Sequence, residues 1–327
     1  MGAAATACKA SRHAAEMRPP ATRAFLEHAA IADDPTFADR YWTSEDGLRL
    51  HFRDYPPASG GQAGERPPVI CLHGLTRNAR DFAGLAAHLA QAGWRVVVPD
   101  MRGRGQSDYA RDPASYHVGR YAADLDALRQ QEGIGRYVAI GTSMGGLMTM
   151  AQAMLDPEPI VASVLNDIGP VVDPAGLERI MDYVGQGGSY PTWMHAARAL
   201  EELHAAAHPG FALDDWLAMA KRGMTLCGNG RIAYDYDMKI AEPLRAAGGA
   251  QAAAPPDLWP GFEALARRPL LLVRGELSNL LTSETFAEMA HRAPDAAQVT
   301  VPGTGHAPTL DEPEARAAID AFLARLG

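Results

Sequence analysis

Short apolar runs alternate with helical patterns along much of the chain. Several runs have the length of strands: Leu48–Tyr55, Val69–Leu72, Trp94–Val98, Tyr137–Ile140, Ile160–Leu165, Pro269–Val273 and Gln298–Val301. Those that are apolar throughout predict strands buried on both faces, which is typical of parallel sheets. In Phe82–Ala92, Tyr121–Gln131 and Pro313–Leu326 the pattern is helical, so these segments are expected to pack against the sheet.

The pattern changes after Pro170. From there to Trp259 the sequence is helical in pattern, is rich in large aromatic and Met residues, and contains no strand-like run. We therefore predict an α/β fold in which residues 41–169 and 260–327 form the sheet core and residues 170–259 form an inserted helical cap. Residues 1–40 are expected to be a partly ordered N-terminal leader.

Composition and charge exclude some classes of function. The hydrophobic fraction of 47% and charged fraction of 21% are those of an ordinary folded protein. A net charge of -9, without a cluster of Lys and Arg, argues against a nucleic-acid partner. The three cysteines lack CxxC spacing, so no zinc site is indicated. Lys9 and Arg12 interrupt the apolar core that a secretory signal needs, so we expect a cytoplasmic protein.

A serine lies between glycines where the run Tyr137–Ile140 meets an apolar helical pattern. The segment 141–145 reads GTSMG. A sharp turn from strand to helix would explain Gly141 and Gly145, because a Cβ is costly in so tight a turn. Such a turn exposes Ser143 at the carboxyl end of a strand, where open α/β sheets bind ligands. We therefore predict a nucleophilic serine rather than a chance polar turn.

A serine hydroxyl needs a base within hydrogen-bond reach. The glycine-rich segment PGTGHA, which follows the last predicted strand, supplies His306, and the order Ser before His occurs in known hydrolases. Some other histidines lie on predicted helices, where we expect surface positions: His28, His88, His195, His204 and His208.

Acyl transfer also needs donors for the developing oxyanion. The strand Val69–Leu72 ends in His73-Gly74, and the next backbone N–H can point towards the serine. We predict the backbone N–H groups of Leu75 and Met144 as the oxyanion hole. His73 is expected to hold the loop by hydrogen bonds rather than to act as a base.

The motifs HGLTRN (73–78), PDMRGRGQSD (99–108), GTSMGG (141–146) and PGTGHAP (302–308) occur in this order. Together they resemble the α/β-hydrolase superfamily, in its branch of small capped esterases, from about Leu48 to Leu326. The resemblance implies a mostly parallel, eight-stranded sheet flanked by helices, with the insertion as a cap. It also implies a structural rather than a dinucleotide-binding role for a set of loop residues: Asp100, Arg102, Gly103, Gly105 and Ser107.

The residue that orients His306 is harder to identify. Family members usually carry Asp or Glu after the seventh strand, where this chain has Asn279, and an amide cannot stabilise an imidazolium by charge. Asp167, after the sixth strand, is our first choice, because some superfamily members carry the acid there. The alternatives are Asn279 itself, either with reduced activity or as an introduced substitution, and then Glu276. Asp167 could instead cap the entry to the insertion.

These observations predict a serine hydrolase of the carboxylesterase type, cleaving small carboxylic esters through an acyl-enzyme on Ser143. This chemistry requires no cofactor and no metal. We expect a small apolar ester as substrate and neither nucleic acid nor membrane as partner, while a homo-oligomer stays open. The alternatives are a lactonase or carbon–carbon bond hydrolase of the same fold, or a catalytically weakened ligand-binding homologue, which Asn279 alone supports.

Overall fold

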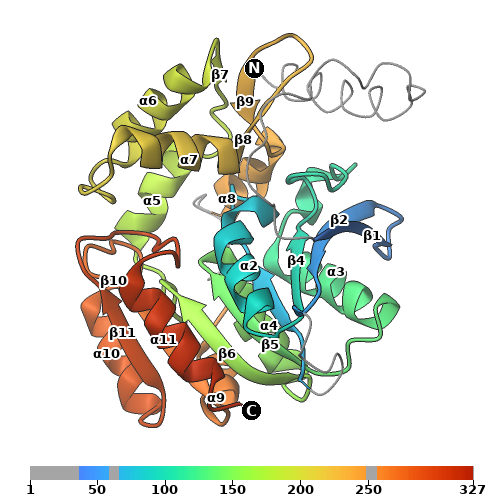
Figure 1. Cartoon of the computed structure of the whole chain (residues 1–327), viewed down its shortest axis with the longest axis vertical. Coiled ribbons are helices and arrows are strands. Elements are labelled where there is room, and N and C mark those ends of the chain that lie inside the picture. Colours follow the sequence, from blue (N-terminus) through green and yellow to red (C-terminus); the bar gives the residue numbers. More distant parts are fainter. Residues whose placement is uncertain (1–36, 59–65, 248–255, 327) are drawn as a thin grey trace.

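An eight-stranded sheet forms the centre of the molecule in a computed structural model that describes residues 37–58, 66–247 and 256–326 (Figure 1). Its order is β1-β2-β4-β3-β5-β6-β10-β11. The first two pairings are antiparallel and the others are parallel. The strands are β1 Ala38–Thr43, β2 Arg49–Tyr55, β3 Val69–Leu72, β4 Val96–Asp100, β5 Tyr137–Thr142, β6 Ile160–Asn166, β10 Leu270–Gly275 and β11 Ala297–Val301.

Helices cover both faces of this sheet. One apolar cluster joins α2 and α11 to alternate strand residues such as Val69 and Cys71, and another joins α3, α4, α9 and α10 to their neighbours, such as Ile70 and Leu72. The prediction of strands buried on both faces is therefore confirmed. The helices are α2 Ala83–Gln91, α3 Val118–Gln131, α4 Met144–Leu155, α9 Trp259–Ala266, α10 Ser283–Arg292 and α11 Pro313–Leu323.

The described part of the insertion, residues 170–247 and 256–258, lies beyond the carboxyl ends of β5 and β6 (Figure 1). It comprises α5 Pro174–Tyr183, β7 Ser189–Tyr190, α6 Trp193–His204, α7 Leu213–Gly223, β8 Met224–Leu226, β9 Ile232–Tyr234 and α8 Ala241–Ala247. The expectation that no strand interrupts it is wrong, because β7, β9 and β8 form a small antiparallel sheet. These strands are too short to show an alternating pattern, although Asn229-Gly230 between β8 and β9 is a recognised hairpin signal.

The N-terminal boundary also differs from the prediction. Residues 1–36 of the expected leader lie outside the described residues, but β1 begins at Ala38 and pairs with β2 along its whole length. The sheet therefore begins before residue 41.

Among the described helices, none is long and apolar enough to cross a membrane. The uncharged stretch 137–155 forms the buried strand β5 and the helix α4.

Candidate active site

Ser143 occupies a sharp turn between β5 and α4. Its φ of 52° and ψ of -116° lie in a region that residues with a Cβ rarely adopt. A Cβ on Gly141 would lie 2.6 Å from the backbone of Gly145, and a Cβ on Gly145 would lie 2.1 Å from the carbonyl oxygen of Leu72. Strand and helix are thus in direct backbone contact, which confirms the steric explanation of both glycines.

His306 links Ser143 to Asp167 through its two ring nitrogens. Nε2 lies 2.9 Å from Ser143 Oγ, and Nδ1 lies 2.8 Å from Asp167 Oδ2. The residues follow β5, β11 and β6, whose carboxyl ends meet at one edge of the sheet. The Asp167 side chain is fully buried, whereas that of His306 is 14% exposed. When Ser143 donates to Nε2, the Nδ1–H donates to the Asp167 carboxylate.

Two further donors hold the Asp167 carboxylate. The backbone N–H of Gly275 lies 2.8 Å from Oδ1, and the Ser278 hydroxyl lies 2.7 Å from Oδ2. The φ of Asp167 is 55°, a conformation in which Asp is more common than most residues. Sequence reasoning missed Ser278, because a serine in a turn has no pattern that distinguishes it.

The alternative acids do not contact His306, whose ring nitrogens are both paired. Asn279 is exposed. Glu276 is also exposed, and its Oε2 accepts a hydrogen bond of 2.7 Å from the backbone N–H of Gly303, in the loop that leads to His306. Of the three residues considered for this position, Asp167 is the one beside the imidazole.

The predicted oxyanion donors lie next to Ser143. Met144 is the first residue of α4, and Leu75 lies on the pocket wall beside Gly74 and Ser143. Within the described part of the chain, neither backbone N–H donates a hydrogen bond to another residue.

His73 is fully buried beneath this loop. Its Nδ1 lies 2.7 Å from the Gly74 carbonyl oxygen, and its Nε2 accepts from the Met101 N–H at 3.1 Å. Burial lowers the pKa of His73 to about 4, so the ring is neutral at pH 7. The prediction that His73 fixes the loop is confirmed.

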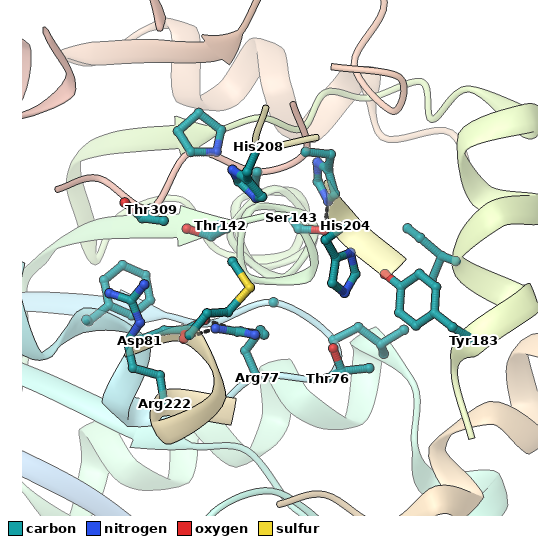
Figure 2. A pocket seen from close by; sticks show the side chains of 18 residues that line it. Thr76, Arg77, Asp81, Thr142, Ser143, Tyr183, His204, His208, Arg222 and Thr309 are labelled. Atoms are coloured by element: carbon teal, nitrogen blue, oxygen red, sulfur yellow. Dashed lines mark hydrogen bonds and ion pairs between the residues drawn. The ribbon is translucent and has the colours of Figure 1, made fainter. Parts of the chain in front are cut away.

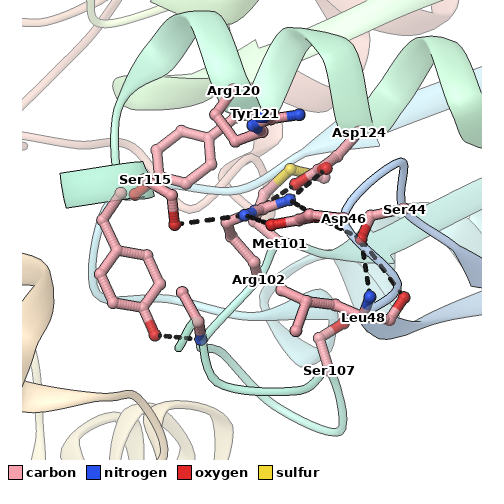
Figure 3. Close-up of polar contacts among 12 residues, drawn as sticks. Ser44, Asp46, Leu48, Met101, Arg102, Ser107, Ser115, Arg120, Tyr121 and Asp124 are labelled. Atoms are coloured by element: carbon pink, nitrogen blue, oxygen red, sulfur yellow. Dashed lines mark hydrogen bonds and ion pairs between the residues drawn. The ribbon is translucent and has the colours of Figure 1, made fainter. Parts of the chain in front are cut away.

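The loop after β4 contains a buried polar network (Figure 3). The Asp100 carboxylate accepts from the N–H groups of Ala79 and Gln106 at 2.6 and 2.9 Å. Arg102 is fully buried and donates to Asp124 and Asp46. A Cβ on Gly105 would lie 2.2 Å from Asp100. These contacts confirm the structural role predicted for the loop.

A pocket opens above Ser143, between the sheet and the insertion (Figure 2). The insertion contributes α5, the end of α6 with its following turn, and α7. The pocket wall contains polar and charged groups as well as apolar ones. Its lining is therefore more polar than the pocket expected for a small apolar ester. The lining includes Arg77, Asp81, Ile180, Tyr183, His204, His208 and Arg222.

The expectation that His204 and His208 are surface residues is wrong. His208 is 5% exposed and stacks on Phe211, with ring centroids 4.4 Å apart. His204 is partly buried and packs edge-on against Tyr183. Burial, together with the positive charge of Arg77, lowers the pKa of both histidines to about 4. The periodicity of the insertion does not show which helical face meets the sheet core. It therefore does not predict that these two histidines are buried.

No group of three or more His, Cys, Asp or Glu residues in the described ranges is arranged to hold a metal ion. The polar groups that do converge are those around Ser143. The arrangement can therefore activate a hydroxyl, accept its proton and stabilise an oxyanion at one point.

Comparisons with known proteins find relatives over most of the chain. The family described as alpha/beta hydrolase fold matches residues 67–313. A 3-hydroxybutyrate-oligomer hydrolase from Cupriavidus necator is 36% identical over 249 residues, which are 75% of this chain and 84% of that protein. A 2-(acetamidomethylene)succinate hydrolase from Mesorhizobium japonicum is 25% identical over 245 residues, or 75% and 83% of the two chains.

A solved structure gives a stronger likeness. The crystal structure of an alpha/beta hydrolase from Novosphingobium aromaticivorans has a TM-score of 0.82 and 57% sequence identity, and the match covers 88% of this chain and 98% of that one.

Proposed function

Because the chain belongs to the α/β-hydrolase family, we propose that it is a serine hydrolase that cleaves small carboxylic esters through an acyl-enzyme on Ser143. The observation that carries this proposal is the hydrogen-bonded series from Ser143 Oγ through His306 to Asp167, which opens onto a pocket. Geometry of this kind activates a serine that is otherwise a weak nucleophile.

In the first half of the reaction, Ser143 Oγ attacks the ester carbonyl carbon and its proton passes to His306 Nε2. The Asp167 carboxylate stabilises the imidazolium that forms. The N–H groups of Leu75 and Met144 donate to the oxyanion of the tetrahedral intermediate. His306 then gives the proton to the departing alkoxide oxygen, so that the alcohol leaves and an acyl-enzyme remains.

In the second half, water attacks the acyl carbon and loses its proton to His306. The new tetrahedral intermediate collapses, Ser143 Oγ recovers the proton, and the carboxylic acid is released. Each proton that His306 accepts is returned within the same half-reaction. The cycle therefore needs no group beyond these residues and water.

The name of one relative indicates a class of candidate substrates. The Cupriavidus necator protein is named as a hydrolase of 3-hydroxybutyrate oligomers, which are linked by esters. We therefore place short esters of hydroxy acids first among the candidate substrates. Lactones and the carbon–carbon bonds of diketones are the next candidates, because the same nucleophile turn serves such enzymes.

A substrate panel tests this proposal. Purified protein is assayed against 4-nitrophenyl acetate and butyrate, linear 3-hydroxybutyrate dimer and trimer, a γ-lactone and a ring-cleavage diketone. We expect hydrolysis of the linear esters, with kcat/KM at least about tenfold above that for the lactone and diketone. Turnover confined to the lactone or the diketone would overturn the ester assignment. Binding without turnover of any substrate would favour a ligand-binding protein.

A further inference from the structure

The charged residues that line the pocket do not balance each other, and this imbalance affects which ester the pocket can bind. Its charged lining residues in the described part of the chain are Arg77, Arg222 and Asp81. His204 and His208 are neutral at pH 7, because burial lowers the pKa of each to about 4. Two guanidinium groups thus face one carboxylate, leaving one positive charge in excess on the wall.

Arg77 is not the source of that excess. Its Nε and Nη2 donate to the two carboxylate oxygens of Asp81, both at 2.5 Å. This is the paired geometry in which a guanidinium and a carboxylate best satisfy each other. Arg77 and Asp81 therefore compensate each other within the wall.

Arg222, at the end of α7, is compensated less well. Its Nη1 lies 3.1 Å from Asp311, but the same carboxylate also accepts from Arg316. One carboxylate thus balances two guanidinium groups. The Nε of Arg222 is buried without a hydrogen-bond partner, and the side chain is 23% exposed. Arg222 therefore lines the pocket with a charge that is only partly balanced and with a donor that has no partner.

Arg222 makes the pocket charged on one side of Ser143, whereas the other side is largely apolar. Figure 2 shows Arg222 and Asp81 on one side of Ser143 and Tyr183 on the opposite side. Ile180 also lines the pocket, one turn before Tyr183 on α5. An ester bound with its carbonyl at Ser143 would extend one part towards a charged wall and the other towards a largely apolar one.

We propose that Arg222 binds a free carboxylate carried by the ester substrate on one side of the scissile bond, while the apolar part of the substrate packs on Ile180 and Tyr183. A guanidinium suits a carboxylate because its N–H groups match both oxygens. This inference rests on the proposed function and adds that the substrate is an anionic half-acid rather than the neutral apolar ester predicted from the sequence.

The test compares esters in which that carboxylate is free or methylated, and it follows cleavage of the shared ester alone, through release of acetate or of 4-nitrophenol. One pair is O-acetyl-3-hydroxybutyrate and its methyl ester, with the carboxylate on the alcohol side. The other pair is 4-nitrophenyl hemisuccinate and its methyl ester, with the carboxylate on the acyl side. For at least one pair, kcat/KM should be about tenfold or more higher for the acid. Raising the salt concentration should reduce this preference.

Arg222→Gln should bring the ratio of the two kcat/KM values close to one, and Arg222→Lys should retain part of the preference because the charge remains. Arg198→Gln is the matched control, since Arg198 is an exposed arginine of the insertion that does not line this pocket. Its ratio should equal that of the wild type.

The outcomes separate the two proposals. Hydrolysis of the neutral esters with no preference for either acid, or a preference that survives in Arg222→Gln, would overturn the role of Arg222 and leave the hydrolase assignment intact. Failure to hydrolyse all four compounds would overturn the proposed function itself.

Discussion

The two walls of the pocket differ in what fixes their residues. On the sheet side, Ser143, His306 and Asp167 follow strand ends, and backbone contacts or hydrogen bonds hold each in place. On the insertion side, His204, His208 and Arg222 lie on or beside helices that pack in a separate apolar cluster of their own. We therefore expect the sheet to provide the catalytic residues and the insertion to select the substrate.

Changing the acid on the sheet side should have the largest effect. Asp167→Asn keeps the shape of the side chain but removes the charge that stabilises the His306 imidazolium. In serine proteases the same change lowers kcat about 10⁴-fold, so we expect a loss of at least about 10²-fold, with KM nearly unchanged. Steady-state kinetics with a 4-nitrophenyl ester measures this.

Asn279→Asp is the matched comparison, because it adds a carboxylate at the position that the family pattern favours. Asn279 is exposed and does not contact His306, so kcat should change by less than about twofold. A large gain in kcat from Asn279→Asp, together with an active Asp167→Asn variant, would move the acid back to the seventh strand.

A smaller effect is expected on the insertion side, in the pH dependence of stability. The pKa of His208 is about 4 in the folded chain and near 6.5 when unfolded. Below pH 6.5 the unfolded state therefore binds a proton that the folded state does not. The free energy of unfolding should fall by about 1.4 kcal/mol per pH unit from this group as the pH drops towards 4.

Urea unfolding of wild type and His208→Gln between pH 7 and 4.5 measures this contribution. The variant should show the shallower decline, whereas His195→Gln, at an exposed position, should follow the wild type. Parallel curves for wild type and His208→Gln would mean that His208 is not held neutral by its surroundings.

Most of the sheet side could be predicted from the sequence because short motifs mark it. Gly141 is required by a contact with Gly145, which is close in sequence, whereas Gly145 is required by a contact with Leu72 of the neighbouring strand β3. His306 follows the strand-like run Gln298–Val301. The acid was ambiguous because its choice depends on three loops meeting in space. Ser278 and Gly275 hold Asp167 from a segment far along the chain, and no local pattern records that contact.

The insertion was harder to predict for a related physical reason. Its helices are amphipathic, but the sequence does not show that a second surface, the sheet edge, covers part of their polar side. His208 therefore looked like a surface residue, although its ring lies between Phe211 and the pocket. The strands β7, β8 and β9 are two or three residues long, which is too short for periodicity to reveal.

The central claim is that Ser143 is the nucleophile, and covalent labelling tests it most directly. Wild-type protein and Ser143→Ala are incubated with a fluorophosphonate probe, and intact mass and peptide mapping locate the adduct. We expect one adduct per wild-type chain, on the peptide containing Ser143, and none on the variant. The melting temperature of the variant should stay within about 2 °C of the wild type, because an elbow hydroxyl contributes little packing. No adduct on the wild type, or equal labelling of a folded Ser143→Ala chain, would contradict the central claim.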